Sequence, residues 1–189
     1  ETYGNAFGLV RINDRGEIDP NFGTNGKVCK SIPSFYETTC KSFDLKQDKG
    51  IVMAGFTRTV NGEQKGVVMQ FNPDGKIDSS FAEAGVLISN FDFGFNDVLI
   101  RSVKALPGDK MMLFGQVTYK DDPNETNGTQ KFFLVRVNGD GTLDNSFADN
   151  GKRVFVFSGS LHSQSAEYLH VLPDGKLLAT GTCDSLETI

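Results

Sequence analysis

One pattern of residues recurs three times along this chain of 189 residues. Each copy opens with a short apolar run that ends in Asn, and continues through a glycine, an aspartate, a phenylalanine and a second glycine at unchanged offsets. The runs lie at residues 7–13, 66–72 and 132–138, and the aligned sets are Gly16, Gly75 and Gly141; Asp19, Asp78 and Asp144; Phe22, Phe81 and Phe147; Gly26, Gly85 and Gly151. A chain with this periodicity is expected to fold as an array of equivalent units.

A second block, which ends in glycine, repeats in the same frame at residues 48–55, 108–115 and 174–181. The apolar runs are short, rich in Val, Ile, Phe and Met, and bounded by Gly, Pro, Asn and Asp, which is typical of β-strands joined by tight turns. No stretch shows a helical period over ten or more residues. We therefore predict an all-β fold, with strands near 41–46, 50–57, 65–72 and 85–90 in one copy and near 99–106, 110–118, 130–137 and 151–157 in the next.

Four-stranded antiparallel sheets that each have an apolar face to cover predict stacked β-propeller blades. The whole chain, 1–189, is expected to be one array of about three repeats, divided into a half blade at 1–32, blades at 38–92 and 97–158, and a half blade at 162–189. The leading half holds the last two strands of a unit and the trailing half the first two. Three blades would make an unusually tight ring, so we expect a segment of a longer propeller, or a protomer whose open edges a partner fills.

The composition of the chain argues against some classes of binding partner. The net charge of −5, from 19 basic and 24 acidic residues, comes without a basic cluster, so nucleic acid is not an expected partner. No apolar run approaches the ~20 residues that span a bilayer, so no membrane span is expected. The first residues lack the charged and apolar regions of a signal peptide, which suggests a mature or trimmed product.

The cysteines number three, too few for a disulfide scaffold, and they lack the paired spacing of a zinc site. Cys29 and Cys40 flank a loop between two apolar segments. A disulfide can join them if those segments pair, and the alternative is two buried free thiols. In the first case Cys183 is unpaired or pairs outside the chain.

The turn sequences at residues 72–81 (NPDGKIDSSF), 138–147 (NGDGTLDNSF) and 172–181 (LPDGKLLATG) resemble the delta-60 repeat, a family of bacterial and some eukaryotic surface or secreted proteins. The resemblance covers nearly the whole chain, although Asp14-Arg15-Gly16 departs from the Pro-Asp-Gly pattern. It implies propeller blades and an extracellular or cell-surface location. It brings no catalytic residues, because the family has none in general.

The same turns place several oxygen ligands close together, as hard cations such as Ca²⁺ prefer. The weak metal candidates are Asn72, Asp74, Asp78, Asn138, Asp140 and Asp144. The first copy, however, has Arg15 where a ligand would stand, and no copy ends in a bidentate Glu. The stronger interpretation is structural, with the aspartates accepting backbone N–H groups in the turns, so no cofactor is expected.

The other candidate sites can each be interpreted as functional or as structural. Asn124 and Asn127 begin overlapping glycosylation sequons in an inserted polar loop at residues 119–130, where a glycan would disturb no packing. The aromatic cluster at 91–95 is either a platform for a glycan or peptide or, more simply, a core plug between blades. His162 and His170 have no repeated partner that would suggest a ligand set or a general base.

These observations favour a non-enzymatic exported propeller module, a surface scaffold for protein–protein or glycan recognition, adhesion or assembly. Its partners would be a protein, further blades that complete the propeller, or a glycan. One rival is a carbohydrate-active propeller enzyme with carboxylates from different blades at a central opening. Another is a structural subunit of an extracellular oligomer or filament, in which neighbouring chains complete the half blades.

Overall fold

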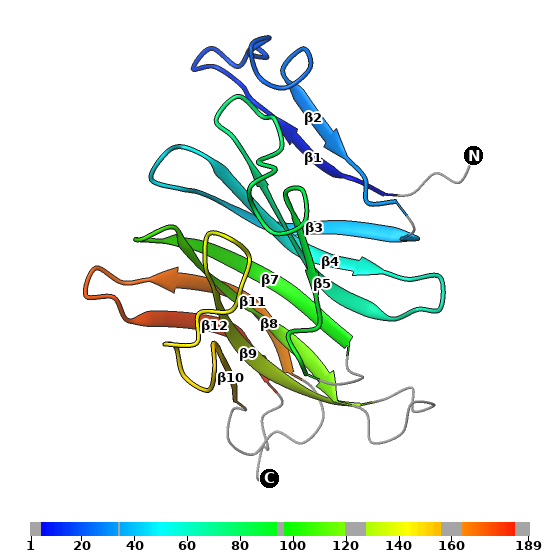
Figure 1. Ribbon diagram of the computed structural model, residues 1–189, viewed down its shortest axis with the longest axis vertical. Helices are drawn as coiled ribbons and strands as arrows, with labels where there is room; N and C mark the ends of the chain where they lie inside the picture. The colour runs from blue at the N-terminus through cyan, green and yellow to red at the C-terminus, as the bar shows by residue number, and fades with distance from the viewer. Residues whose placement is uncertain (1–4, 34, 94–96, 120–127, 156–163, 184–189) are drawn as a thin grey trace, which may run out of the picture.

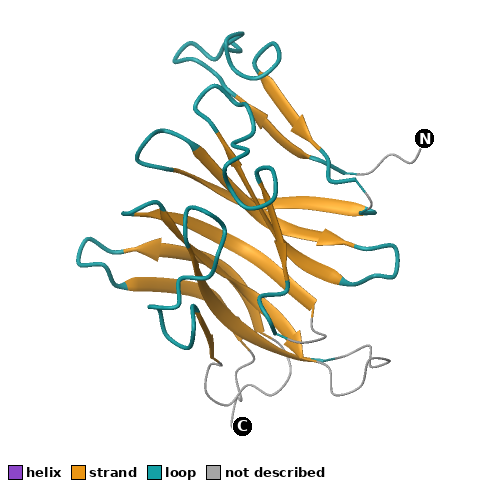
Figure 2. Cartoon of the chain, viewed as in Figure 1, coloured by secondary structure: helices purple, strands orange, loops and turns teal. Residues whose placement is uncertain are grey.

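The structure, a computed structural model, describes residues 5–33, 35–93, 97–119, 128–155 and 164–183. These residues form twelve β-strands and no helix (Figures 1 and 2). The strands are β1 Phe7–Val10, β2 Lys27–Lys30, β3 Glu37–Leu45, β4 Ile51–Arg58, β5 Gln64–Phe71, β6 Val86–Ser89, β7 Asp97–Leu106, β8 Lys110–Tyr119, β9 Thr129–Val137, β10 Lys152–Phe155, β11 Gln164–Val171 and β12 Leu177–Cys183. Accordingly, no described segment is a helix long and apolar enough to cross a membrane.

The strands assemble into four antiparallel sheets. Two are complete four-stranded sheets, β3-β4-β5-β6 and β7-β8-β9-β10, and two are hairpins, β1-β2 and β11-β12. Figure 1 shows them in one open array, with β1-β2 at one end and β11-β12 at the other. The predicted all-β class and the repeated four-stranded antiparallel sheets are confirmed.

The first strand of each complete sheet begins earlier than the sequence suggests, at Glu37 and Asp97. For β3 a β-bulge explains the difference, because the predicted start at residue 41 falls at the bulge, whereas the predicted start of β7 at residue 99 already lies before its own bulge. The register of β3 on β4 shifts between Cys40 and Ser42, that of β7 on β8 between Ile100 and Ser102, and that of β11 on β12 between Ala166 and Tyr168. The extra residue breaks the in-out alternation that identifies a strand in a sequence.

The bulge explains the glycine that ends each copy of the second sequence block. Gly55, Gly115 and Gly181 lie opposite the residue at which the bulge starts. A Cβ atom on any of them would overlap a backbone carbonyl oxygen of the facing strand, that of Thr39, Leu99 or Ser165. Only glycine allows this close approach of two backbones.

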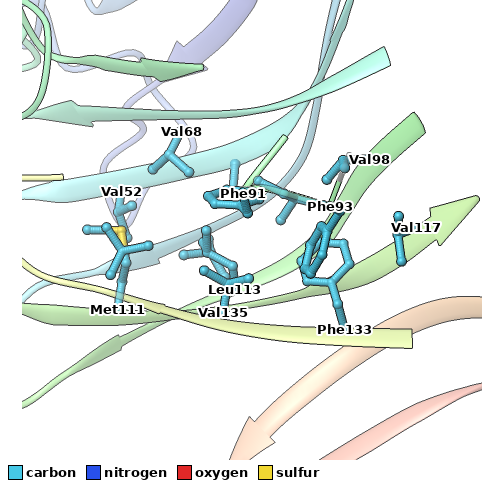
Figure 3. Close-up of a cluster of buried hydrophobic side chains, with 14 of the residues drawn as sticks. Val52, Val68, Phe91, Phe93, Val98, Met111, Leu113, Val117, Phe133 and Val135 are labelled. Atoms are coloured by element: carbon cyan, nitrogen blue, oxygen red, sulfur yellow. The ribbon is translucent and has the colours of Figure 1, made fainter. Parts of the chain in front are cut away.

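Three apolar clusters separate the successive sheets. The largest lies between sheets β3–β6 and β7–β10 and contains Val52, Val68, Leu113, Phe133 and Val135 (Figure 3). A second cluster, around Phe7, Met53 and Met69, joins hairpin β1-β2 to sheet β3–β6. The third, around Phe114, Phe132 and Leu169, joins sheet β7–β10 to hairpin β11-β12. Each sheet therefore shields the apolar face of its neighbour.

Strand β4 shows how alternation builds two interfaces from one strand. Ile51 and Met53 belong to the cluster shared with hairpin β1-β2, whereas Val52 and Ala54 belong to the cluster shared with sheet β7–β10. The aligned residues of β8 divide in the same way, with Met111 and Leu113 in the cluster shared with sheet β3–β6 and Met112 and Phe114 in the cluster shared with hairpin β11-β12. Each of the two complete sheets thus has one face toward the preceding unit and another toward the next.

The repeated phenylalanines Phe22, Phe81 and Phe147 occupy corresponding places, one in each cluster. Phe22 and Phe81 are buried, and the residue after each donates its N–H to a turn of the next unit, Gly23 to the carbonyl of Asp74 and Ala82 to that of Asp140. Phe147 is only half-buried, because the described part of the next unit, β11-β12, has no such turn.

The aromatic cluster at residues 91–95 is a core plug in its described part. Phe91 and Phe93 are buried, and both rings pack against Phe133, with centroid distances of 6.2 and 5.3 Å (Figure 3). Lys152 donates to the backbone carbonyl of Phe91 at 2.9 Å. These side chains close the junction between the two complete sheets and are not a binding platform.

Candidate functional site

An open groove of about 560 Å³ lies beside β1, β3 and β4. Most of the side chains that line it are apolar, and its charged lining residues are Arg11 and Lys49. The apolar part consists mainly of Leu9, Val10, Phe43, Leu45, Ile51 and Met53. Phe43 and Leu45 are each 59% exposed, which is unusual for large apolar residues on a sheet face that is covered elsewhere.

The equivalent face of the next unit shows why the groove is open. Val103 of β7, which aligns with Phe43, is completely buried beneath sheet β3–β6. Of the described strands, those of hairpin β1-β2 alone lie on the corresponding face of sheet β3–β6, and this hairpin matches the third and fourth strands of a unit. The groove is therefore the space that the first and second strands of a preceding unit would occupy.

Side-chain to backbone hydrogen bonds mark each closed junction between first strands. Ser42 Oγ accepts from the N–H of Val103 at 3.2 Å, and the aligned Ser102 Oγ accepts from the N–H of Leu169 at 3.2 Å. The corresponding position of the last unit is Tyr168, which is 49% exposed. No described strand covers the face of β11-β12 that points away from sheet β7–β10, and Leu178 on it is 55% exposed.

Three charged side chains meet at the outer turn of the second complete sheet. Asp144 Oδ2 accepts from Lys110 Nζ at 2.6 Å and from Arg136 Nε at 2.7 Å, while Asp144 Oδ1 accepts from Ser146 Oγ at 2.6 Å. Asp144 is buried, and the hydrogen bond from Lys110 is the main cause that holds its pKa well below the usual range. The Arg136 guanidinium also lies 4.9 Å above the Phe147 ring. We call Lys110, Asp144 and Arg136 the charged triad.

Replacing Asp144 with Asn should lower stability in a pH-dependent way. Because the folded-state pKa is depressed, the carboxylate stabilises the fold above its unfolded pKa of about 3.9, and this contribution is lost as the pH falls toward the folded value. Urea denaturation of both proteins should therefore show a gap in unfolding free energy at neutral pH that shrinks in acid. Asp149→Asn, a control at a side chain that is 78% exposed, should show little gap, and an equal gap at every pH would contradict the argument.

The first unit holds two members of an equivalent triad. Arg11 Nε donates to Asp19 Oδ2 at 2.8 Å and its guanidinium lies 4.7 Å above the Phe22 ring. Arg11 also donates to the backbone carbonyl of Pro73 at 2.8 Å, and this hydrogen bond links the first unit to the next one. Lys176, just before β12, aligns with Lys110. It forms an ion pair with Asp174 of its own turn at 2.6 Å.

The candidate metal ligands are engaged in their own turns. Asp74 accepts from the N–H of Lys76 and pairs with its Nζ at 2.8 Å, and Asp78 accepts from both the N–H and the hydroxyl of Ser80. Asp140 likewise accepts from the N–H and the hydroxyl of Thr142. Asn72 and Asn138 each accept, through their backbone carbonyls, the N–H of the turn glycine, Gly75 or Gly141. Within the described ranges, no three His, Cys, Asp or Glu side chains gather closely enough to hold a metal ion.

The structure does not form the disulfide considered for Cys29 and Cys40, since both are free thiols. Their segments do not pair: Cys29 lies on β2, which pairs with β1, and Cys40 on β3, which pairs with β4. The alternative of two buried free thiols is right that both are free but wrong about their burial, because Cys29 is exposed and Cys40 is half-buried. The sequons at Asn124 and Asn127, and His162, lie outside the described residues, and the described His170 is exposed on β11.

The two thiols should differ in reactivity. Burial raises the pKa of the Cys40 thiol, and the thiolate is the form that reacts. Iodoacetamide at mildly alkaline pH should therefore modify Cys29 well before Cys40, as followed by peptide mass spectrometry. Addition of urea should remove the difference, and equal rates in the folded protein would contradict the placement of Cys40.

Comparison with known families supports the propeller class. Residues 47–81 and 122–147 match the family model described as a domain of unknown function (DUF5122) beta-propeller. Together with the open array of four-stranded sheets, the match defines the chain as a β-propeller repeat domain whose described sheets do not close into a ring. No curated protein matches the chain. The delta-60 name stays a sequence-based resemblance.

Sequence reasoning missed the groove and the charged triad. The signal for the groove was present in the two half units, but which of their faces lie open depends on how the hairpins pack. The signal for the triad was the shared spacing of Arg11 to Asp19 and of Arg136 to Asp144. Its third member, Lys110, comes from a different strand and is found only from the fold.

Proposed function

We propose that this chain is a non-enzymatic repeat module of an exported or cell-surface protein, and that it acts as a rigid scaffold which binds protein partners through its open sheet face. The module is one array over residues 1–189, divided at 1–32, 38–92, 97–158 and 162–189. The exported location draws its support from the resemblance to surface proteins. The two sequons in the inserted loop agree with it if the source glycosylates its exported proteins.

The observation that carries the proposal is the groove beside β1 and β3. It combines exposed apolar side chains, Phe43 and Leu45, with a strand edge, because in the described chain β1 is hydrogen-bonded to β2 alone. An incoming strand gains backbone hydrogen bonds from such an edge and apolar contacts from the neighbouring face. Binding by β-strand addition is therefore the function that this surface supports best.

The groove supports protein recognition better than glycan chemistry. Hydrolysis of a glycosidic bond requires two carboxyl groups on opposite sides of the bond, and none of the residues that line the groove is Asp or Glu. A sugar also needs polar partners for its hydroxyl groups, whereas this lining is mostly apolar. A hydrophobic hairpin or strand needs neither a pair of carboxyl groups nor many polar partners, so it fits this lining.

A displayed library of short β-hairpin peptides tests the proposal. Selection on the immobilised 189-residue protein should enrich hairpins with alternating apolar residues, and Phe43→Asp should weaken their binding about tenfold or more, which is about 1.4 kcal/mol. Val60→Asp is the matched control, because Val60 is 81% exposed in the turn between β4 and β5, outside the groove. Hairpins that bind Phe43→Asp as tightly as the parent, or hydrolysis of a polysaccharide by the protein, would overturn the proposal.

A further inference from the structure

The two ends of the array carry complementary parts of one unit. Hairpin β1-β2 corresponds to the third and fourth strands of the complete sheets, and hairpin β11-β12 to the first and second. In the complete sheets the second strand pairs on both sides, β4 with β3 and β5, and β8 with β7 and β9. Among the described residues β12 pairs with β11 alone and β1 with β2 alone, so the missing ladder is the one between β12 and β1.

We infer that the β11-β12 hairpin of one copy inserts into the groove beside β1 and β3 of a second copy, so that the chain assembles head to tail. This inference rests on the proposed function and names the partner as the protein itself. It uses the same open edge and apolar face, filled by the hairpin that, among the described strands, has the matching strand positions.

The two complete sheets fix the register of the new ladder. Gly55 pairs with Val67 and Gly115 with Phe133. When β12 is placed beside β1, the equivalent pair is Gly181 opposite Gly8. The same alignment sets Ala179 opposite Val10 and Leu177 opposite Ile12, as Met53 pairs with Met69 and Ile51 with Phe71.

The inserted hairpin would complete the charged triad. In sheet β7–β10 the second strand supplies Lys110, the third supplies Arg136, and the turn after the third strand supplies Asp144. The first unit already pairs Arg11 with Asp19 at 2.8 Å, and Lys176 of the incoming hairpin stands at the position of Lys110. In sheet β3–β6 the positions of Lys110 and Arg136 are both changed, to Gly50 and Gln70. There Lys46 donates a hydrogen bond to the side-chain oxygen of Gln70. The lysine and the arginine of the triad are therefore replaced together.

Uncovered apolar side chains gather on the two surfaces that this assembly would join. We call Val10, Ile12, Ile18, Phe43 and Leu45 the head face, and Phe147, Tyr168 and Leu178 the tail face. The large apolar residues that are exposed in the described chain number nine, and seven of them belong to these faces. The aligned residues at the closed junctions, such as Met69, Val103 and Met112, are at most 2% exposed.

The contact is heterologous, since a head face meets a tail face, and it repeats until the array closes into a ring or extends as a filament. Sedimentation velocity of the 189-residue chain should therefore show species larger than the monomer that grow with protein concentration. Lys176→Glu should weaken this association about tenfold or more, because it places a second carboxylate beside Asp19. Lys76→Glu is the matched control: Lys76 is 80% exposed in the same kind of turn, pairs with Asp74, and lies outside both faces.

A mixing experiment tests the polarity of the contact. Phe43→Asp blocks the head face and Leu178→Asp blocks the tail face, and both side chains are exposed, so each variant should fold, as circular dichroism can verify. Each should be monomeric alone, and the mixture should form a one-to-one dimer that grows no further. A wild-type chain that stays monomeric, a mixture that fails to associate, or Lys176→Glu and Lys76→Glu with equal effects would each overturn the inference. A monomeric wild type that still selects groove-binding hairpins would leave the proposed function standing, so the two failures are distinguishable.

Discussion

Truncating Phe133 to Ala should cost about 3–5 kcal/mol of unfolding free energy, since a fully buried aromatic side chain loses its burial and leaves a cavity. Phe133 is completely buried in the cluster between the two complete sheets, where its ring contacts those of Phe91 and Phe93 (Figure 3). Few of its neighbours can collapse into the space, because they belong to two sheets that are each held by backbone ladders. The loss would be a large fraction of the ~5–15 kcal/mol by which ordinary domains are stable.

Urea denaturation followed by circular dichroism measures this loss, at a protein concentration low enough for the chain to be monomeric. Phe43→Ala is the matched control, because it removes the same atoms from a side chain that is 59% exposed. We expect this control to cost less than about 1 kcal/mol, as surface changes usually do. Equal losses for the two variants would mean that the cluster between the sheets is not the main core.

Replacing Gly115 with Ala should destabilise the protein by about 1–3 kcal/mol, although alanine is normally acceptable in a strand. The new Cβ atom would overlap the carbonyl oxygen of Leu99 at the bulge, and would lie 2.9 Å from the Phe133 ring. Relief requires the backbone of β7 to move away from β8, which disturbs the hydrogen bond that Ser102 Oγ accepts from the N–H of Leu169. Gly55→Ala should behave alike, because its Cβ would overlap the Thr39 carbonyl.

Gly8→Ala is the control for this prediction. A Cβ atom at Gly8 would meet nothing within 4 Å, and the loss of backbone freedom in the unfolded chain should make the change neutral or slightly stabilising. Thermal and urea denaturation of the three variants should therefore separate Gly8→Ala from the other two. If Gly115→Ala were as stable as the parent, the close approach of the two backbones at the bulge could not be the reason for the repeated glycine.

The repeat made most of the fold predictable. Glycines and aspartates at unchanged offsets located the turns, and short β-branched runs located the strands, because both signals depend on local backbone preferences. The first strand of the first complete sheet was predicted to begin near residue 41 and not at Glu37, since the bulge after Cys40 reverses the alternation there. A bulge is a property of two paired strands, and one strand's sequence does not reveal it.

The candidate site was much less predictable. The turn aspartates attracted attention as metal ligands, but Asp74, Asp78 and Asp140 bind groups two residues further along their own turns. The exposed apolar residues of the groove have ordinary strand sequences, and Phe43 looks no different from the buried Val103 that aligns with it. Whether such a residue is covered depends on the neighbouring unit and not on the residue.

The amino-acid sequence alone determined that this protein is an array of equivalent antiparallel sheets, because periodic turns and strands are local features that repeat with the residues that encode them. Only the tertiary structure decided which faces are covered, which side chains complete the charged triad, and that Cys29 and Cys40 stay apart. These outcomes depend on contacts between units that are distant in the chain. Equivalent sequences can therefore have one face buried at a junction and the same face open at the end of the array.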